Sequence, residues 1–176
     1  AFVLCCVSRA IPEKGWSEAI EVVEMARSLS GRDIRLIFVG NGKVYEEYCR
    51  NGKPDYVYLA GFNDNSVGHY AASDMGIMLT RFKSESFPLT IVDCLFAGKP
   101  YLATDVGEIR NILTSPEGIA GDVIPLDDWQ IPIELCAQSL LQFVMDREHY
   151  LEATDRAIKT SKRYRIDEVI DQYLEV

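Results

Sequence analysis

Two cations flank a short loop near the start of the chain. Arg9 directly follows an apolar run, and Lys14 stands five residues later, just before a helical pattern begins. The forked guanidinium of an arginine can bind two oxygens of one anion, whereas a lysine acts as a point charge. Two cations over a loop that joins a strand to a helix would suit a diphosphate. The alternative interpretation is a surface loop whose charges bind nothing.

Two carboxylates bracket a second segment, which reads ESFPLTIVD from Glu85 to Asp93. If helix geometry held throughout, the two would lie about 12 Å apart along the helix axis. The paired carboxylates of a glycosidase are only about 5 to 9.5 Å apart, so the spacing argues against a hydrolase pair. It suits carboxylates that bind hydroxyls at opposite ends of a longer polar ligand, with helix amides between them facing phosphate oxygens. The alternative is a capping carboxylate followed by an ordinary helical aspartate.

Short apolar runs alternate with helical patterns over the first two thirds of the chain. We expect strands at 2–7, 34–39, 56–60, 75–79, 101–103 and, at a sheet edge, 123–125, with helices at 17–29, 44–50, 66–72, 88–97 and 108–113. Continuous apolar strands between helices indicate a parallel sheet that is covered on both faces. Right-handed crossovers then predict an α/β fold, a Rossmann-like doubly wound parallel sheet of about six strands. The last third is expected to be helical, at 131–145, 148–163 and 166–174.

Ligands of such a sheet bind beyond the carboxyl ends of its strands. The candidate loops are therefore 8–15, 40–42, 61–63, 80–89 and 104–107. The Gly40-Asn41-Gly42 turn lacks the spacing of a dinucleotide fingerprint, and we interpret it as a strand exit that needs positive φ. Trp16 and Trp129 are interpreted as packing residues.

Composition excludes several classes of function. A net charge of −9 argues against sequence-independent nucleic-acid binding. No apolar run approaches the roughly 18 residues that a membrane span needs. Five cysteines at irregular spacing and two histidines favour reduced, buried thiols over a disulfide framework or a zinc site. The basic cluster in residues 156–165 is interpreted as a solvated helix face.

Motifs between Val7 and Glu108 together resemble the second domain of the retaining GT-B glycosyltransferases, the glycogen-synthase-like group 1 family. The family has Gly-Arg then Lys-Gly after its first strand, a Val-Gly-x-Gly turn, a strand that ends in Gly, and two Glu separated by seven residues. It then has Ala-x-x-x-Gly-x-Pro-x-x-x-Thr, followed by Asp-x-Gly-Gly. The matching segments here are Ser8-Arg9, Lys14-Gly15, Val39–Gly42, Gly61-Phe62, Glu85–Asp93, Gly98–Pro100 and Thr104–Gly107.

The resemblance implies that residues 1–176 form the nucleotide-sugar (donor) binding domain, the second half of a GT-B fold. It implies that Arg9 and Lys14 neutralise the donor diphosphate, that Glu85 is catalytic and meets the donor sugar, and that Asp93 holds the ribose hydroxyls. The same resemblance assigns five further residues to the nucleotide-sugar site: Gly61, Phe62, Phe87, Pro88 and Leu89.

The same resemblance also implies which cofactors, partner domain and cellular location to expect. We expect no metal and no cofactor other than the nucleotide sugar itself, because no Asp-x-Asp motif is present. We expect a part of a longer cytoplasmic enzyme whose N-terminal domain binds the acceptor glycan or lipid-linked saccharide and makes any peripheral contact with the inner face of the membrane. The fragment alone would then transfer no sugar.

Departures from the family pattern leave other functions open. Asp93 replaces the usual glutamate and is one methylene shorter, and both Pro88 and Glu108 replace glycines. Pro88 has no N–H to offer a phosphate, although proline is favoured in the first turn of a helix. One alternative is a catalytically degenerate nucleotide-sugar-binding module of the same fold. Another is a different enzyme of this fold, such as a nucleotide-sugar epimerase.

Overall fold

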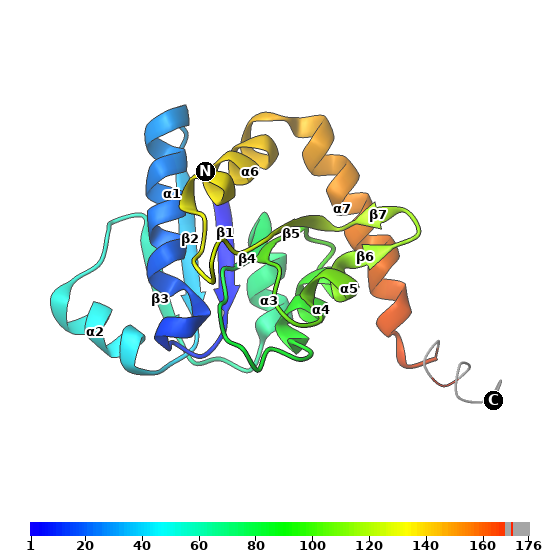
Figure 1. The fold of residues 1–176 in the computed structure, drawn as a ribbon, viewed down its shortest axis with the longest axis horizontal. Helices are drawn as coiled ribbons and strands as arrows, with labels where there is room; N and C mark the ends of the chain where they lie inside the picture. Colours follow the sequence, from blue (N-terminus) through cyan, green and yellow to red (C-terminus); the bar gives the residue numbers. More distant parts are fainter. Residues whose placement is uncertain (168–169, 171–176) are drawn as a thin grey trace.

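A six-stranded parallel sheet lies at the centre of the computed structural model, which describes residues 1–167 and 170 (Figure 1). The strand order β3-β2-β1-β4-β5-β8 is that of a Rossmann-like sheet, as predicted. The strands are β1 (Phe2–Val7), β2 (Ile34–Val39), β3 (Val57–Gly61), β4 (Met75–Met78), β5 (Tyr101–Thr104) and β8 (Gly121–Ile124). The four central strands are short and mostly buried, which explains why their sequences are largely apolar, whereas the edge strand β3 buries only Val57 and β8 is half buried.

Helices cover both faces of the sheet, because successive side chains of a strand point to opposite sides. In β1, Leu4 and Cys6 pack into a core shared with the helices α1 and α6, whereas Cys5 and Val7 pack into a second core with α3, α4 and α5. The helices are α1 (Trp16–Ser30), α2 (Lys43–Asn51), α3 (Ser66–Ala71), α4 (Leu89–Phe96), α5 (Ile109–Leu113), α6 (Ile133–Met145) and α7 (Arg147–Ser161).

Most predicted elements agree with the structure to within one or two residues, and the differences involve short elements. A 3-10 turn η1 (Pro12–Lys14) precedes α1, and the small antiparallel pair β6 (Thr114–Ser115) and β7 (Gly118–Ile119) was not predicted. Strands of two residues are too short to show a hydrophobic period. The helix predicted over 148–163 ends at Ser161 and is followed by a second 3-10 turn, η2 (Lys162–Tyr164). Most of the helix predicted over 166–174 lies outside the described residues.

Two predictions, that the cysteines are buried and that both tryptophans are packing residues, are each wrong for one residue. Four of the five cysteines are buried, but Cys49 is exposed, since α2 buries only Val44 and presents its other side to solvent. Trp16 is buried and stacks on Phe38 with ring centroids 4.2 Å apart, as expected of a packing residue. Trp129 is 43% exposed and is therefore no core residue.

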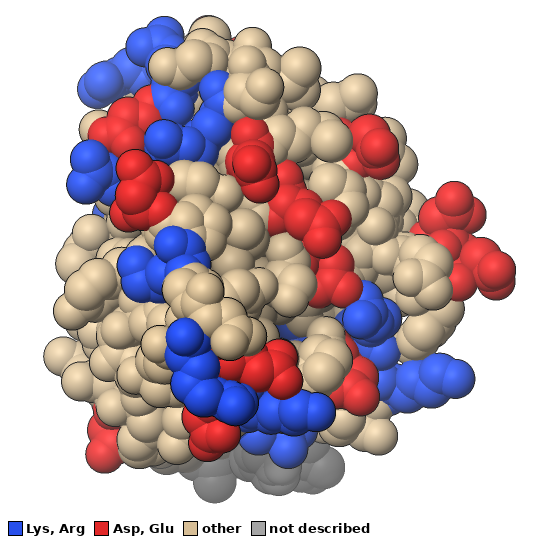
Figure 2. Space-filling view, turned by 90° about the vertical axis from the view of Figure 1, so that its left-hand side faces the viewer, with Lys and Arg blue, Asp and Glu red and all other residues tan. Residues whose placement is uncertain are grey.

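Charged side chains of both signs are interspersed on the face that Figure 2 shows, which looks onto the side of α1 and α2. The basic cluster near the end of α7 is a solvated helix face, as predicted. Two of its members form ion pairs one turn apart, Arg156 with Glu152 at 3.3 Å and Lys159 with Asp155 at 2.6 Å.

Candidate nucleotide-sugar site

The strand order reverses between β1 and β4, and the loops that follow these two strands meet there. The connections from β1 and β2 lead to one edge of the sheet, while those from β4 and β5 lead to the other. Gly15 allows the loops to approach, because its φ is +69° and a Cβ at this position would lie 1.7 Å from the carbonyl oxygen of Leu79. In open α/β sheets such a switch point is where ligands bind.

Lys14 and Glu85 form a buried ion pair at this point. The Lys14 ammonium donates to Oε2 of Glu85, and the two side chains are only 9% and 8% exposed. The hydroxyl of Thr80 also donates to Oε2 at 3.2 Å. The pair joins residues 71 positions apart, so it ties the β1 loop to the β4 loop. Two residues that the sequence assigned to diphosphate and sugar thus lie in direct contact.

A glycine of the β5 loop packs against the backbone of Glu85. Gly107 has a φ of +57°, and a Cβ there would lie 1.6 Å from the carbonyl oxygen of Glu85. The hydroxyl of Thr104, at the end of β5, donates to the carbonyl oxygen of Thr80. Three strand ends therefore converge on the buried ion pair and fix its position.

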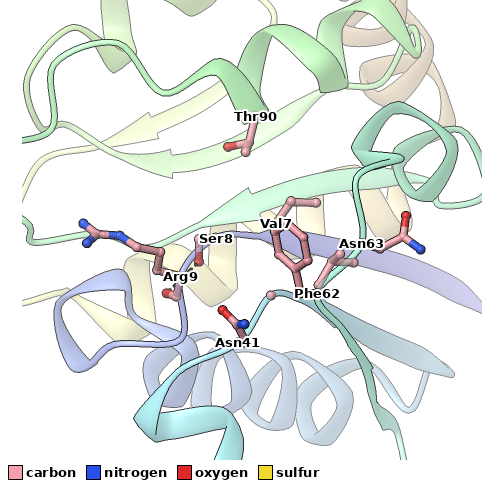
Figure 3. A pocket seen from close by; sticks show the side chains of 9 residues that line it. Val7, Ser8, Arg9, Asn41, Phe62, Asn63 and Thr90 are labelled. Atoms are coloured by element: carbon pink, nitrogen blue, oxygen red, sulfur yellow. Dashed lines mark hydrogen bonds between the residues drawn. The ribbon is translucent and has the colours of Figure 1, made fainter.

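A pocket of about 240 Å³ lies at the carboxyl ends of β1, β2 and β3 (Figure 3), and the predicted site residues Lys14, Glu85 and Asp93 are not among those that line it. Arg9 extends from one end of it and Phe62 lies at the other, with Asn41 and Thr90 between them. The lining residues are Val7, Ser8, Arg9, Val39, Gly40, Asn41, Phe62, Asn63 and Thr90. Apolar walls with a few polar groups are typical of small-molecule sites.

Both predicted phosphate ligands lie against one aromatic ring. The guanidinium carbon of Arg9 is 5.4 Å from the centroid of the Phe82 ring, and the ammonium of Lys14 is 5.2 Å from it. Arg9 is exposed and forms no ion pair within the described part of the chain. Its charge is therefore available to an anion, whereas that of Lys14 is shared with Glu85.

Asp93 lies on α4 three residues after Thr90, and residues at this spacing share a helix face. Its carboxylate accepts a hydrogen bond from the hydroxyl of Ser66, at the start of α3. Asp93 is therefore held beside the pocket by a partner that itself could donate to or accept from a ligand hydroxyl.

The structure brings some of the predicted site residues together and leaves others apart. Arg9 and Phe62 line the pocket, and Gly61 ends β3 with its carbonyl bonded to the amide of Gly40 at 2.8 Å. Phe87 instead packs edge-on against Tyr164 with ring centroids 6.0 Å apart. Pro88 caps α4, and Leu89 begins it with a 67% exposed side chain. Neither lines the pocket.

Several pocket residues were named only as parts of candidate loops or not at all. Asn41, Asn63 and Thr90 line it, and each follows or faces a strand end. Ser66 was missed, because nothing in its local sequence shows that it meets Asp93 across 27 residues. Ser8 stands where the family pattern has glycine, and its hydroxyl accepts a hydrogen bond from the indole N–H of Trp16 at 2.9 Å.

The glycines of the β2 exit are structural, as predicted. Gly40 has a φ of +148°, and a Cβ there would lie 2.0 Å from the carbonyl oxygen of Ser8. Gly42 has a φ of +137° and is similarly close to Ala10. The sulfur of Cys6 lies 3.8 Å from the hydroxyl of Ser8, and burial raises the pKa of this thiol to about 12, so it stays neutral.

Among residues 1–167 and 170, no three His, Cys, Asp or Glu side chains lie close enough together to hold a metal ion. No helix in the described part of the chain is both long and apolar enough to cross a membrane.

Comparison with known families identifies the chain. Residues 1–142 match the family described as glycosyl transferases group 1. The chain belongs to this family. Among curated proteins, the chain is 27% identical over 124 residues to the lipopolysaccharide core biosynthesis mannosyltransferase LpsB of Rhizobium meliloti (strain 1021), covering 70% of this chain and 34% of that protein. It is 26% identical to the phosphatidyl-myo-inositol mannosyltransferase of Mycobacterium leprae (strain TN), covering 94% of this chain and 43% of that one.

Solved structures show the same GT-B-type fold. The pneumococcal O-GlcNAc transferase GtfA, solved in complex with UDP and GlcNAc, superposes with a TM-score of 0.80 at 18% identity, over 99% of this chain and 35% of that one. Anabaena HepE in complex with UDP and glucose gives a TM-score of 0.73 at 18% identity, over 99% and 47%. This group 1 chain thus spans less than half the length of the proteins that it matches.

Proposed function

We propose that this domain binds a nucleotide-diphosphate sugar in the pocket at the carboxyl ends of β1, β2 and β3, and that it supports retaining transfer of the sugar. The observation that carries the proposal is the placement of Arg9 and Lys14. Both cations lie on the Phe82 ring, and Arg9 lines the pocket. Solved relatives of the same fold hold UDP together with a sugar.

The diphosphate would lie between Arg9 and the N-terminus of α4. Arg9 offers a forked donor, and Lys14 retains donor capacity beyond its bond to Glu85, because an ammonium has three N–H groups. The first amides of α4 have no partner within the helix and favour an anion. As the sugar leaves, negative charge develops on the diphosphate, and fixed cations stabilise that charge more than the ground state.

The donor sugar and the ribose would lie on opposite sides of the diphosphate. Glu85 is held by Lys14 and Thr80, so its carboxylate is already oriented to accept hydrogen bonds from sugar hydroxyls. Asp93 lies two turns further along and faces Ser66, which suits the hydroxyls of a ribose. Binding in this arrangement needs no metal, since the two cations neutralise the diphosphate.

The acceptor would be a glycan or a lipid-linked saccharide, and a second domain would bind most of it. This proposal rests on the length of the relatives, of which the chain covers 34% and 43%. The isolated domain would then bind the donor and transfer nothing. The partners are accordingly a small-molecule nucleotide sugar and the N-terminal domain of the longer protein.

Calorimetric titration with UDP, GDP, ADP and dTDP, each in excess EDTA, tests the proposal. We expect one of the four to bind with 1:1 stoichiometry and the chelator to have no effect. Binding that vanishes with EDTA would refute the metal-free site, and no binding of any of them would refute the nucleotide site. Turnover by the isolated domain with a nucleotide sugar would contradict the need for a second domain.

A turnover assay on the longer protein, run beside the same titration, separates the enzyme from a degenerate binding module. A module that has lost catalysis would bind the nucleotide but show no turnover, with or without Glu85→Gln. In the enzyme, this variant should reduce turnover while leaving the affinity for the nucleoside diphosphate nearly intact.

A further inference from the structure

A second pocket, of about 390 Å³, is lined by Glu13 and Ser84, the chain neighbours of the ion-paired Lys14 and Glu85, and shares no lining residue with the nucleotide pocket. Its lining residues are Glu13, Arg81, Phe82, Lys83, Ser84 and Trp129. Phe82 lines this pocket, and the ammonium of Lys14 lies 5.2 Å from the centroid of its ring. The pocket and the buried ion pair therefore both contact Phe82.

Trp129 reaches this pocket from an unusual turn between β8 and α6. Asp127 and Gln130 bond to each other through both amides, at 3.0 and 2.8 Å, which closes a two-residue turn. The two central residues, Asp128 and Trp129, have φ of +44° and +62°. Positive φ at both positions is the type I′ geometry, in which asparagine or aspartate and then glycine are preferred.

A tryptophan at the glycine position of this turn is strained, and strain of this kind is retained where a site needs it. Asp128 tolerates the left-handed region because aspartate can bond to nearby backbone, but Trp129 has no such compensation. The strained residue is also not hidden in the core, since 43% of it is exposed. The turn thus holds a large aromatic face at the surface at a cost in stability.

The indole of Trp129 is fixed in direction over the β4 loop. Its Nε1–H donates to the carbonyl oxygen of Arg81 at 3.2 Å, and Arg81 is itself anchored by an ion pair with Glu18. The ammonium of Lys83 lies 5.4 Å from the centroid of the indole ring, and Lys83 forms no ion pair with any described residue. An oriented aromatic face therefore stands beside an unpaired cation.

We propose that this pocket, the Trp129 pocket, is a saccharide subsite that holds a pyranose ring of the acceptor next to the donor sugar. A pyranose has apolar C–H faces and a rim of hydroxyls. The indole face of Trp129 can pack against the apolar C–H face of the sugar. Glu13, Lys83 and Ser84 offer hydrogen-bond acceptors and donors to its hydroxyls. The assignment to the acceptor rests on the proposed function, because the pocket adjoins Lys14 and Glu85.

Saturation-transfer NMR with the whole chain, saturated with its nucleoside diphosphate, tests this inference. The probes are methyl α-D-glucopyranoside, methyl α-D-mannopyranoside and N-acetylglucosamine. We expect at least one to bind while the nucleotide stays bound, since the pockets are distinct. Trp129→Gly should weaken that saccharide at least tenfold and leave the nucleotide affinity unchanged. Phe96→Ala, which removes another exposed aromatic ring (46% exposed) on α4, should change neither.

The melting temperature of Trp129→Gly also tests whether the turn is strained. Trp129→Gly should melt no lower than the wild type, because glycine suits the turn, whereas a purely structural Trp129 would lower the melting temperature on removal. If Trp129→Gly fails to fold, Lys83→Met leaves the turn intact and should weaken the saccharide several-fold. Equal saccharide binding by the wild type and the variants, competition between saccharide and nucleotide, or no binding of any probe to the nucleotide-bound chain would overturn the inference. Absence of nucleotide binding would instead refute the proposed function.

Discussion

Replacing Lys14 with methionine should both destabilise the domain and remove its preference for diphosphates. Methionine keeps the apolar length of the side chain but, among the described residues, leaves the buried carboxylate of Glu85 with only the Thr80 hydroxyl as partner. Breaking a buried pair by removing one partner costs about 3 to 5 kcal/mol. For a domain of this size that corresponds to a fall in Tm of about 6 to 20 °C.

A double variant separates stability from binding. Lys14→Met with Glu85→Leu removes both charges, and replacing a buried pair with apolar side chains is often neutral or stabilising. The double variant should therefore recover most of the lost stability. It should still bind the nucleoside diphosphate about 10- to 150-fold more weakly, since a charge-assisted contact contributes about 1.5 to 3 kcal/mol. Affinity for the nucleoside without phosphates should change little.

Urea denaturation and calorimetry measure the two effects, and Lys159→Met is the matched control. Lys159 pairs with Asp155 on an exposed helix face, where such pairs contribute about 0.3 to 0.5 kcal/mol. If Lys14→Met were as stable as Lys159→Met, the ion pair would not be buried and charged. If diphosphate and nucleoside lost affinity equally, Lys14 would act through folding and not through the phosphates.

Three further predictions follow from the same site and core. Gly107→Ala should destabilise the domain by several times more than Gly31→Ala, which also has positive φ but meets nothing within 4 Å; equal melting temperatures would contradict the close approach to Glu85. Asp93→Asn should weaken a ribonucleotide more than its 2′-deoxy analogue, and Asp93→Glu should tighten the ribonucleotide; equal losses for both sugars would remove the ribose assignment. At pH 8 a thiol reagent should modify Cys49 alone in the native chain, because burial keeps the other four thiols protonated; rapid labelling of more than one thiol would contradict this core.

Much of the fold could be predicted because its central strands are buried on both faces and therefore largely apolar. That pattern also indicates where a ligand site is expected, since the loops after the strands must lie at one edge of a parallel sheet. Arg9 was recognised in this way, and it does line the pocket. Spacing within one segment could place Glu85 before a helix and Asp93 inside it, as the structure has them.

Contacts between distant segments could not be predicted in the same way. Lys14 and Glu85 were each assigned to a ligand, but their contact spans 71 residues and depends on the loop packing around Gly15 and Gly107. The turn that exposes Trp129 has aspartate at its first central position but tryptophan where glycine is preferred, so its sequence does not indicate a left-handed backbone at Trp129. Trp129 was interpreted as a packing residue, like Trp16, although it is 43% exposed.

A crystal structure of this chain with the nucleoside diphosphate that it binds best is the most direct test of the central claim. We predict that the two phosphates lie within about 2.7 to 3.2 Å of the donor atoms of Arg9 and Lys14. The ribose should meet Asp93, and no metal should bridge the phosphates. A diphosphate bound away from the β1 loop, or held there by a metal ion without contact to Arg9 or Lys14, would contradict the account.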